Sequence, residues 1–155
     1  MSMTGLRSFD STVHTTVEWI DDLIQDSVCK DRQQAYHAMR SVLHAVRDRL
    51  SIDEATDLGA QLPMLVRGFY YEGWRPAGKP TKERSREEFL QRVRDELSVA
   101  PGQSPIVDPR DAIIGVFRLL TRRISVGEVE HVFNSLPSAV RELWQEAVAV
   151  GASRG

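Results

Sequence analysis

The sequence predicts an all-α fold made of two pseudo-symmetric four-helix repeats packed as one helical domain. Apolar residues recur at helical spacing along most of the 155 residues, and no stretch shows the sustained alternation typical of strands. In addition, residues 38–70 recur without a gap, 74 positions later, as residues 112–144. The identical pairs are Ala38/Ala112, Val42/Val116, Arg49/Arg123, Ser51/Ser125, Glu54/Glu128, Leu62/Leu136, Pro63/Pro137, Val66/Val140 and Arg67/Arg141. Amphipathic periodicity does not require matching proline, serine, glutamate and arginine, so we interpret the similarity as an internal repeat.

The repeat divides the chain into a first helical repeat at residues 9–74, a linker at residues 75–84 and a second helical repeat at residues 85–147. The linker reads Arg-Pro-Ala-Gly-Lys-Pro-Thr-Lys-Glu-Arg. Proline and glycine interrupt regular structure, and basic side chains favour contact with water. We therefore expect an exposed, mobile connection between the two repeats.

Four helices are expected in the first repeat. The first covers residues 10–25, and one face of it, which we expect to point toward the core, is formed by Phe9, Val13, Val17, Ile20 and Ile24. The second covers residues 31–50; Arg40, Arg47 and Asp48 fall outside its apolar stripe. The third begins after Ser51 and ends at the corner formed by Pro63, and the fourth covers residues 64–71.

Capping signals mark where these helices begin. Four capping-box patterns, in which a cap residue is followed three positions later by Glu or Gln, are Asp31/Gln34, Ser51/Glu54, Ser85/Glu88 and Ser125/Glu128. In the second repeat, Asp108-Pro109 supplies a cap followed by an N1 proline, and Pro137 turns the chain into the last helix. The second repeat therefore has the same predicted order of helices as the first.

Three stretches of the first repeat resemble a bacterial family catalogued as domain of unknown function 2267. They are Arg-Asp-Arg-Leu-Ser-x-x-Glu-Ala at residues 47–55, Leu-Gly-Ala-Gln-Leu-Pro at residues 58–63 and Arg-Gly-Phe-Tyr-Tyr-Glu-Gly-Trp at residues 67–74. The resemblance covers residues 9–145 and implies an all-helical, two-repeat cytoplasmic protein without an established activity or catalytic residues. The second repeat departs from this pattern, because Gly127 stands in place of Asp53 and Phe133-Asn134-Ser135 in place of Gly59-Ala60-Gln61.

Composition narrows the classes of protein to which this chain can belong. Lys and Arg number 20 against 22 Asp and Glu, so no global charge favours nucleic acid or an anionic membrane. A single cysteine, Cys29, excludes an intramolecular disulfide and a cysteine-cluster metal site. The amino-terminal residues lack the apolar segment of a signal peptide, and no apolar run is long enough to span a membrane. We therefore expect a cytoplasmic protein without membrane contact.

Four arginines recur at matched positions and are candidate anion-binding or structural residues: Arg49, Arg67, Arg123 and Arg141. Guanidinium groups bind carboxylates and phosphates through a planar fork of donors, which would give two pseudo-equivalent anion sites. The same groups also bind carbonyls at the ends of helices. We favour the structural interpretation, because each arginine lies next to a predicted helix end or proline corner.

Residues 69–86 interleave aromatic and basic side chains. The candidate contact residues are Tyr71, Trp74, Arg75, Lys79, Lys82, Arg84 and Arg86. Rings that stack on bases and cations that contact phosphates are the combination used by proteins that bind single-stranded nucleic acid. The alternative is a helix end followed by a solvated linker, in which Tyr70 packs in the core like its counterpart Trp144.

The functional prediction is a non-enzymatic protein-interaction or scaffold module, with an unknown protein partner or self-association. His14, His37, His44 and His131 lack metal-ligand spacing, and no nucleophile motif or phosphate-binding glycine loop occurs, so we predict no metal, cofactor or catalytic residues. Two alternatives remain: nucleic-acid binding through residues 69–86, and a small-ligand site between the repeats.

Overall fold

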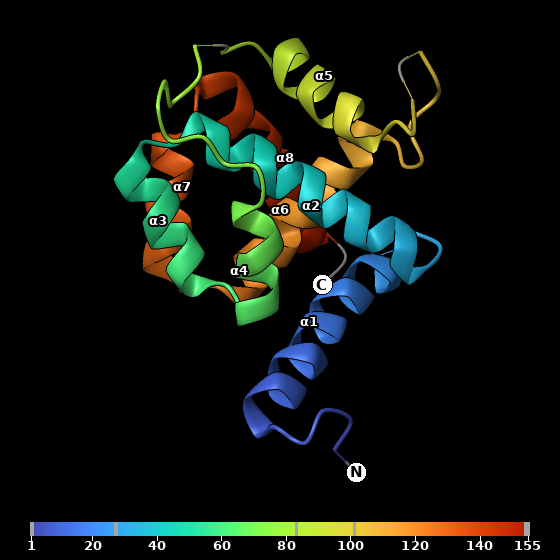
Figure 1. Ribbon diagram of the computed structural model, residues 1–155. Coiled ribbons are helices and arrows are strands. Elements are labelled where there is room, and N and C mark those ends of the chain that lie inside the picture. The colour runs from blue at the N-terminus through green and yellow to red at the C-terminus, as the bar shows by residue number, and fades with distance from the viewer. Residues whose placement is uncertain (1, 27, 83, 101, 154–155) are drawn as a thin grey trace.

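The computed structural model describes residues 2–26, 28–82, 84–100 and 102–153, and over these ranges the chain is all-α, as predicted (Figure 1). An isolated bridge between Ser98 and Pro105 is the one β-type pairing in this part of the chain. The helices are α1 (Arg7–Gln25), α2 (Arg32–Arg49), α3 (Ile52–Gln61), α4 (Met64–Tyr71), α5 (Arg86–Leu97), α6 (Pro109–Arg123), α7 (Val126–Ser135) and α8 (Ser138–Ser153).

The predicted caps are present at the helix starts. Ser51 Oγ accepts a hydrogen bond from Glu54 N at 3.2 Å, and Glu54 Oε2 accepts one from Ser51 N at 3.3 Å, which completes a capping box on α3. Ser125 caps α7 in the same way, but its own amide donates to Gln61 Oε1 at 3.2 Å, at the end of α3. Gln61 of the first half therefore accepts the hydrogen bond of the Ser125 amide that the capping-box pattern predicted for Glu128.

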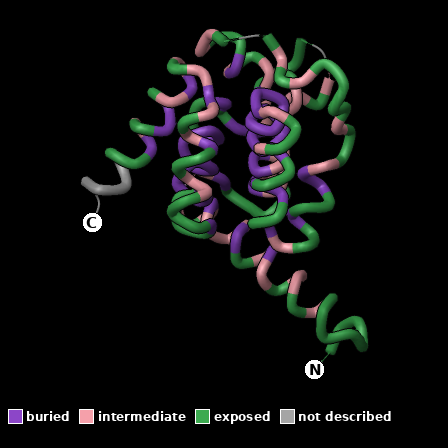
Figure 2. The backbone as a smooth tube through the Cα atoms, turned by 90° about the vertical axis from the view of Figure 1, so that its left-hand side faces the viewer, coloured by how far each residue is buried: buried purple, intermediate pink, exposed green. Residues whose placement is uncertain are grey.

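Two central helices, α2 and α6, contact each other and form the middle of the core. Every residue from 41 to 50 and from 112 to 120 is buried, as the purple interior of Figure 2 shows. α1 and α5 each pack against both central helices, α4 lies along α2, and α8 lies along α6. α3 and α7 pack against each other at one side of the molecule (Figure 1).

The helix contacts follow one scheme in the two halves. α1 contacts α2, α4 and α6, while α5 contacts the corresponding helices α6, α8 and α2. α3 contacts α4 as α7 contacts α8, and the contacts α2–α6 and α3–α7 join corresponding helices. A pseudo-twofold axis would produce this pattern. The superposition of residues 31–71 on residues 108–144 stays a prediction.

The core covers the apolar face expected for the first helix only in part, because Ile20 and Ile24 pack against the core from its edge. α1 begins at Arg7 rather than Asp10, and it buries Thr16, Trp19 and Leu23. Phe9 is 49% exposed, and Val13, Val17, Ile20 and Ile24 are only half-buried. The side of α1 that carries Trp19 faces the core, because a large ring contributes more to burial than a valine does. The amino-terminal turns of α1 project beyond the body of the molecule (Figures 1 and 2).

The linker is exposed over most of its described length but is fastened at one point. Thr81 N donates to Asp48 O at 2.8 Å, and Thr81 Oγ1 accepts from Arg49 at 2.6 Å. Glu83 lies outside the described residues. The linker therefore bonds to the carboxyl-terminal end of α2 rather than only spanning the two halves.

Gly115 lies where α1 packs closely on α6, whereas Gly68 lies on an open surface. A Cβ on Gly115 of α6 would lie 2.7 Å from a methyl of Val28 and 3.3 Å from one of Leu23, whereas a Cβ on Gly68 of α4 would meet nothing within 4 Å.

We expect Gly68→Ala to raise the free energy of unfolding by about 0.4–1 kcal/mol, as alanine restricts the unfolded chain. Gly115→Ala should lower it, because overpacking costs about 1–3 kcal/mol. Urea denaturation of both variants measures the difference, and equal stabilisation would contradict this packing of α1 on α6.

Candidate functional site

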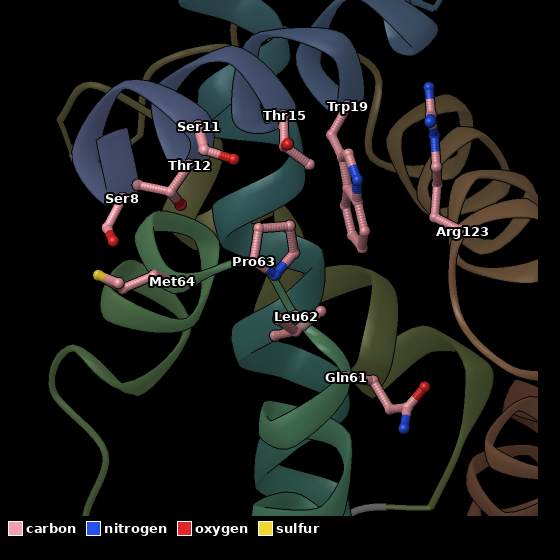
Figure 3. A pocket seen from close by; sticks show the side chains of 10 residues that line it. All are labelled: Ser8, Ser11, Thr12, Thr15, Trp19, Gln61, Leu62, Pro63, Met64 and Arg123. Atoms are coloured by element: carbon pink, nitrogen blue, oxygen red, sulfur yellow. The ribbon is translucent and has the colours of Figure 1, made fainter. Parts of the chain in front are cut away.

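A polar cleft of about 550 Å³ lies between α1 and the α3–α4 corner (Figure 3). One wall carries hydroxyls spaced three or four residues apart on α1, and they belong to Ser8, Ser11, Thr12 and Thr15. Residues 61–64 form the opposite wall, and Arg123 of α6 stands at one end. The cleft is thus formed by both halves of the chain.

Hydrogen bonds fix the walls of this cleft. Thr12 Oγ1 accepts from Leu65 N at 3.0 Å, which joins α1 to the first turn of α4. Arg123 donates to both carboxylate oxygens of Asp22 at 2.9 and 3.1 Å, and this hydrogen bonding raises its pKa above the ordinary value. Because the arginine charge is already balanced, the cleft offers hydroxyls more than it offers a cation. The described residues that line it offer hydroxyl, amide and guanidinium groups, which can form hydrogen bonds with a polar group.

The recurring arginines of the first half have internal partners. Arg67 donates to Gly59 O at 2.8 Å and to Leu62 O at 2.9 Å, carbonyls at the end of α3. Arg49 is 5% exposed, donates to Thr81 and lies over the ring of Phe89 at 5.7 Å. Both guanidinium groups therefore hold neighbouring segments together.

Their counterparts in the second half contact different groups. Arg123 pairs with α1, as described above, and Arg141 lies 6.0 Å from the centre of the Phe133 ring. Phe133 occupies the position of Gly59 in the repeat, so a ring stands beside Arg141 where Arg67 has a backbone carbonyl. The sequence positions recur, but the arginines do not form two equivalent sites.

The aromatic–basic segment separates into a packed part and an exposed part. Tyr70 is buried, and the half-buried ring of Tyr71 lies 4.9 Å from Tyr70 and 5.4 Å from Trp74. Neither Tyr71 nor Trp74 thus presents a fully exposed ring for base stacking, because each fills space beside α3 and α4. Arg75, Lys82 and Arg84 are exposed and Lys79 is half-buried, whereas Arg86 is bound to Glu146 at 3.0 Å. Arg86 is therefore not a freely solvated cation.

A buried charged cluster between α2, α4 and α5 escaped the sequence analysis. His44 Nδ1 lies 2.6 Å from Glu96 Oε1, and His44 Nε2 lies 2.6 Å from Phe69 O. Both partners are hydrogen-bond acceptors, so the two ring nitrogens of His44 link α5 to the end of α4. Arg40 and Arg92 also bind Glu96, at 2.9 and 3.2 Å.

The cluster continues along α2 toward the linker. Arg47 Nε donates to Asp48 at 2.9 Å, and Arg47 NH1 donates to Tyr70 O at 2.7 Å. Arg92 reaches Asp48 as well, at 3.3 Å. These charges therefore join the carboxyl-terminal turns of α2 to the end of α4 and to α5.

The two carboxylates of this cluster are held in their ionised form. Burial by itself raises the pKa of Glu96, but the hydrogen bond and charge of His44, together with Arg92 and Arg40, outweigh burial and place the pKa below its ordinary value. Burial likewise raises the pKa of Asp48, and Arg47, Lys79 and Arg92 bring it below the ordinary value. Each carboxylate is bound by at least two cationic side chains, which suits a structural role.

A sequence signal for the cluster exists but has two interpretations. Arg40, His44, Arg47 and Asp48 are spaced at intervals that place them on one face of α2. A polar helical face is ordinarily solvated, and the positions of α4 and α5 make this one buried. No group of three or more His, Cys, Asp or Glu side chains in the described ranges is placed to hold a metal ion.

The fold and these sites define an all-helical domain with a polar cleft and a buried ionic cluster. A family model described as "Uncharacterized conserved protein (DUF2267)" matches residues 16–143, and the chain belongs to this family. The match confirms the resemblance found in the first repeat. Comparison with curated proteins gives no match. Among the described helices, none has the length and apolar content to span a bilayer.

Removing the Arg67 guanidinium leaves the carbonyls of Gly59 and Leu62 without their charged donor. We expect Arg67→Ala to lower the free energy of unfolding by about 1–2 kcal/mol, with water replacing part of the lost bonding. Arg141→Ala should cost less, about 0.5–1 kcal/mol, because it removes a single cation–ring contact. Thermal and urea denaturation compare the two variants. An Arg67→Ala protein as stable as wild type would contradict the brace and favour the anion-site interpretation.

Acid should weaken the cluster through Glu96 and Asp48. Both folded-state pKa values are depressed, so both groups contribute stability above their unfolded values, about 4.3 and 3.9, and this contribution is lost as the pH falls toward the folded values. Glu96→Gln should be destabilising by about 1–3 kcal/mol at neutral pH, since it removes the carboxylate that Arg40, His44 and Arg92 share. It should also flatten the acid limb of the plot of stability against pH.

The control for this experiment is Asp95→Asn, which changes an exposed carboxylate on the same helix. Free energies of unfolding of the wild type and the two variants are measured from neutral to acidic pH. If Glu96→Gln and Asp95→Asn behave alike, the cluster does not stabilise the fold.

Proposed function

We propose that this protein is a non-enzymatic protein-interaction module whose contact surface lies on α1 and the first turn of α4. The observation that carries the proposal is the partial displacement of the apolar stripe of α1 from its buried face. We define the α1–α4 surface by the apolar side chains Leu6, Phe9, Val13, Met64 and Leu65. Four of these are exposed, with fractions of 46% to 54%, and Val13 is half-buried.

The surroundings of this surface support a protein partner. Exposed apolar side chains that gather on one face, next to polar groups, are typical of interfaces, whereas single exposed ones are normal. Here the hydroxyls of the cleft border the apolar residues, and the bond between Thr12 and Leu65 fixes α1 against α4. A partner helix that buries an apolar stripe against α1 would gain apolar contacts with the surface and hydrogen bonds with the hydroxyls of the cleft.

The bacterial cytoplasm is the compartment that we propose, from the resemblance of the first repeat to a bacterial family. A protein that acts by binding needs no catalytic set, and the lining of the cleft offers hydroxyls without an adjacent base. Nucleic-acid binding has less support, because the rings of residues 69–74 contact one another and the protein interior.

The test replaces Phe9 and Leu65 together by serine. Two exposed valines outside the surface, Val99 and Val126, give a matched control variant with both changed to serine. Loss of central apolar contacts should weaken partner binding or self-association by about tenfold or more, while the control variant binds as wild type does. Quantitative capture from host lysate measures a partner, and sedimentation measures self-association.

Two results would overturn the proposal. One is a serine variant that retains the same protein with wild-type affinity. The other is a wild-type chain that stays monomeric at all concentrations and retains no protein that the Phe9/Leu65 variant loses. Thermal denaturation of each variant establishes that the fold is intact.

A further inference from the structure

A second cavity, distinct from the α1–α4 surface, lies between α7 and α8. Its volume is about 410 Å³, within the range of small-ligand sites, and Thr121 of α6 contributes to its lining. Apolar side chains dominate the walls and belong to Val129, Phe133, Trp144 and Val148. Phe133 and Trp144 meet edge to face, with ring centres 6.5 Å apart. We call this cavity the α7–α8 pocket.

The repeat explains why this space is open. The offset of 74 positions places Gln145 on Tyr71 and Val148 on Trp74. In the first half, the Tyr71 ring fills the space against Gly59 so closely that a side chain on that glycine has no room, and its other neighbours are Tyr70 and Trp74. At these matched sequence positions the second half thus has an amide and an isopropyl group, whereas the first half has a phenol at the end of α4 and an indole just beyond it.

Two further differences between matched positions change the size of the pocket, but together they do not fill it. Phe133 stands at the position of Gly59 and adds one ring from α7. Thr121 stands at the position of Arg47, whose long side chain is buried in the first half, so the α6 side of the pocket also has a shorter residue. The cavity remains beside Phe133 and Trp144.

The rim determines what kind of aromatic group fits. Glu130 is the charged residue among the described residues that line the pocket, and Asn134 and Gln145 add amide groups. The carboxylate accepts hydrogen bonds and repels negative charge, so it matches a donor on the occupant and disfavours an anion, while each amide can either donate or accept. We infer that the α7–α8 pocket binds a planar aromatic small molecule with an N–H donor and no negative charge, of the size of an indole.

The experiment uses indole as the probe and the three tryptophans as reporters. Trp144 lines the pocket, whereas Trp19 and Trp74 lie elsewhere in the fold. Indole should shift the Nε1–H resonance of Trp144 saturably and leave the resonances of Trp19 and Trp74 in place. Indole-3-acetate should bind about twofold to fivefold more weakly, because of the Glu130 carboxylate, and Glu130→Gln should remove that difference.

Val148→Trp restores the residue type of the first half and should fill the pocket. It should weaken indole binding by about tenfold or more. Val99→Trp, on an exposed loop, is the matched control and should leave the affinity unchanged. Gln145→Tyr provides a second filling variant, which decides the question if Val148→Trp does not fold.

Three results would overturn the inference. The first is the absence of a saturable shift at Trp144. The second is indole binding that survives both filling variants. The third is a Trp144 resonance that moves with protein concentration instead of indole, which would mean that a second copy of the chain covers the pocket.

Discussion

Burial of charged residues in the carboxyl-terminal half of α2 is the constraint on which the arrangement of the first half depends. His44, Arg47 and Asp48 are each at most 5% exposed. A charge in that position is tolerated only when hydrogen-bonded and balanced. The end of α4 supplies carbonyls and α5 supplies Glu96 and Arg92, so both helices must lie against α2.

The second central helix meets the same requirement with different residues. Arg118 of α6 occupies the repeat position of His44 and is 8% exposed. Its partner is Asp26, the residue that follows α1, at 3.2 Å, and Arg123 at the end of α6 binds Asp22 of α1. Each central helix therefore receives at least one acidic partner from the first helix of the other half or from the residue that follows it. This exchange of partners joins the two halves by charge as well as by apolar packing.

The proposed contact sites arise where the two halves differ. Tyr71 and Trp74 close the space beside α3 and α4, whereas Gln145 and Val148 leave the α7–α8 pocket open. The amino-terminal end of α1 extends past the body of the molecule (Figure 2). Phe9, in the first turns of this helix, is 49% exposed. The proposed contact sites thus lie where the matched sequence positions of the two halves carry different residues or where one half extends further.

Helix identity and most boundaries were predictable, because they depend on local chemistry. Asp31, Ser51, Ser85 and Ser125 cap their helices as the sequence indicated, and the Leu-Pro corners end α3 and α7. The candidate sites were less predictable. Periodicity gives the angle of a residue on its own helix but not the neighbour that it meets. The charged face of α2 was therefore indistinguishable from a solvated one, and Trp19 displaced the stripe of α1 in part from the core.

The sequence by itself determined the all-α class of the chain, the eight helices of its described residues with their caps and corners, and the family to which the chain belongs. Only the tertiary structure decided the roles of the matched arginines. Arg67 and Arg141 share a sequence position, yet one meets carbonyls and the other meets a ring, since Gly59 and Phe133 differ. The partner of a long flexible side chain depends on groups that are distant in the chain, and their distances are set only when the helices pack.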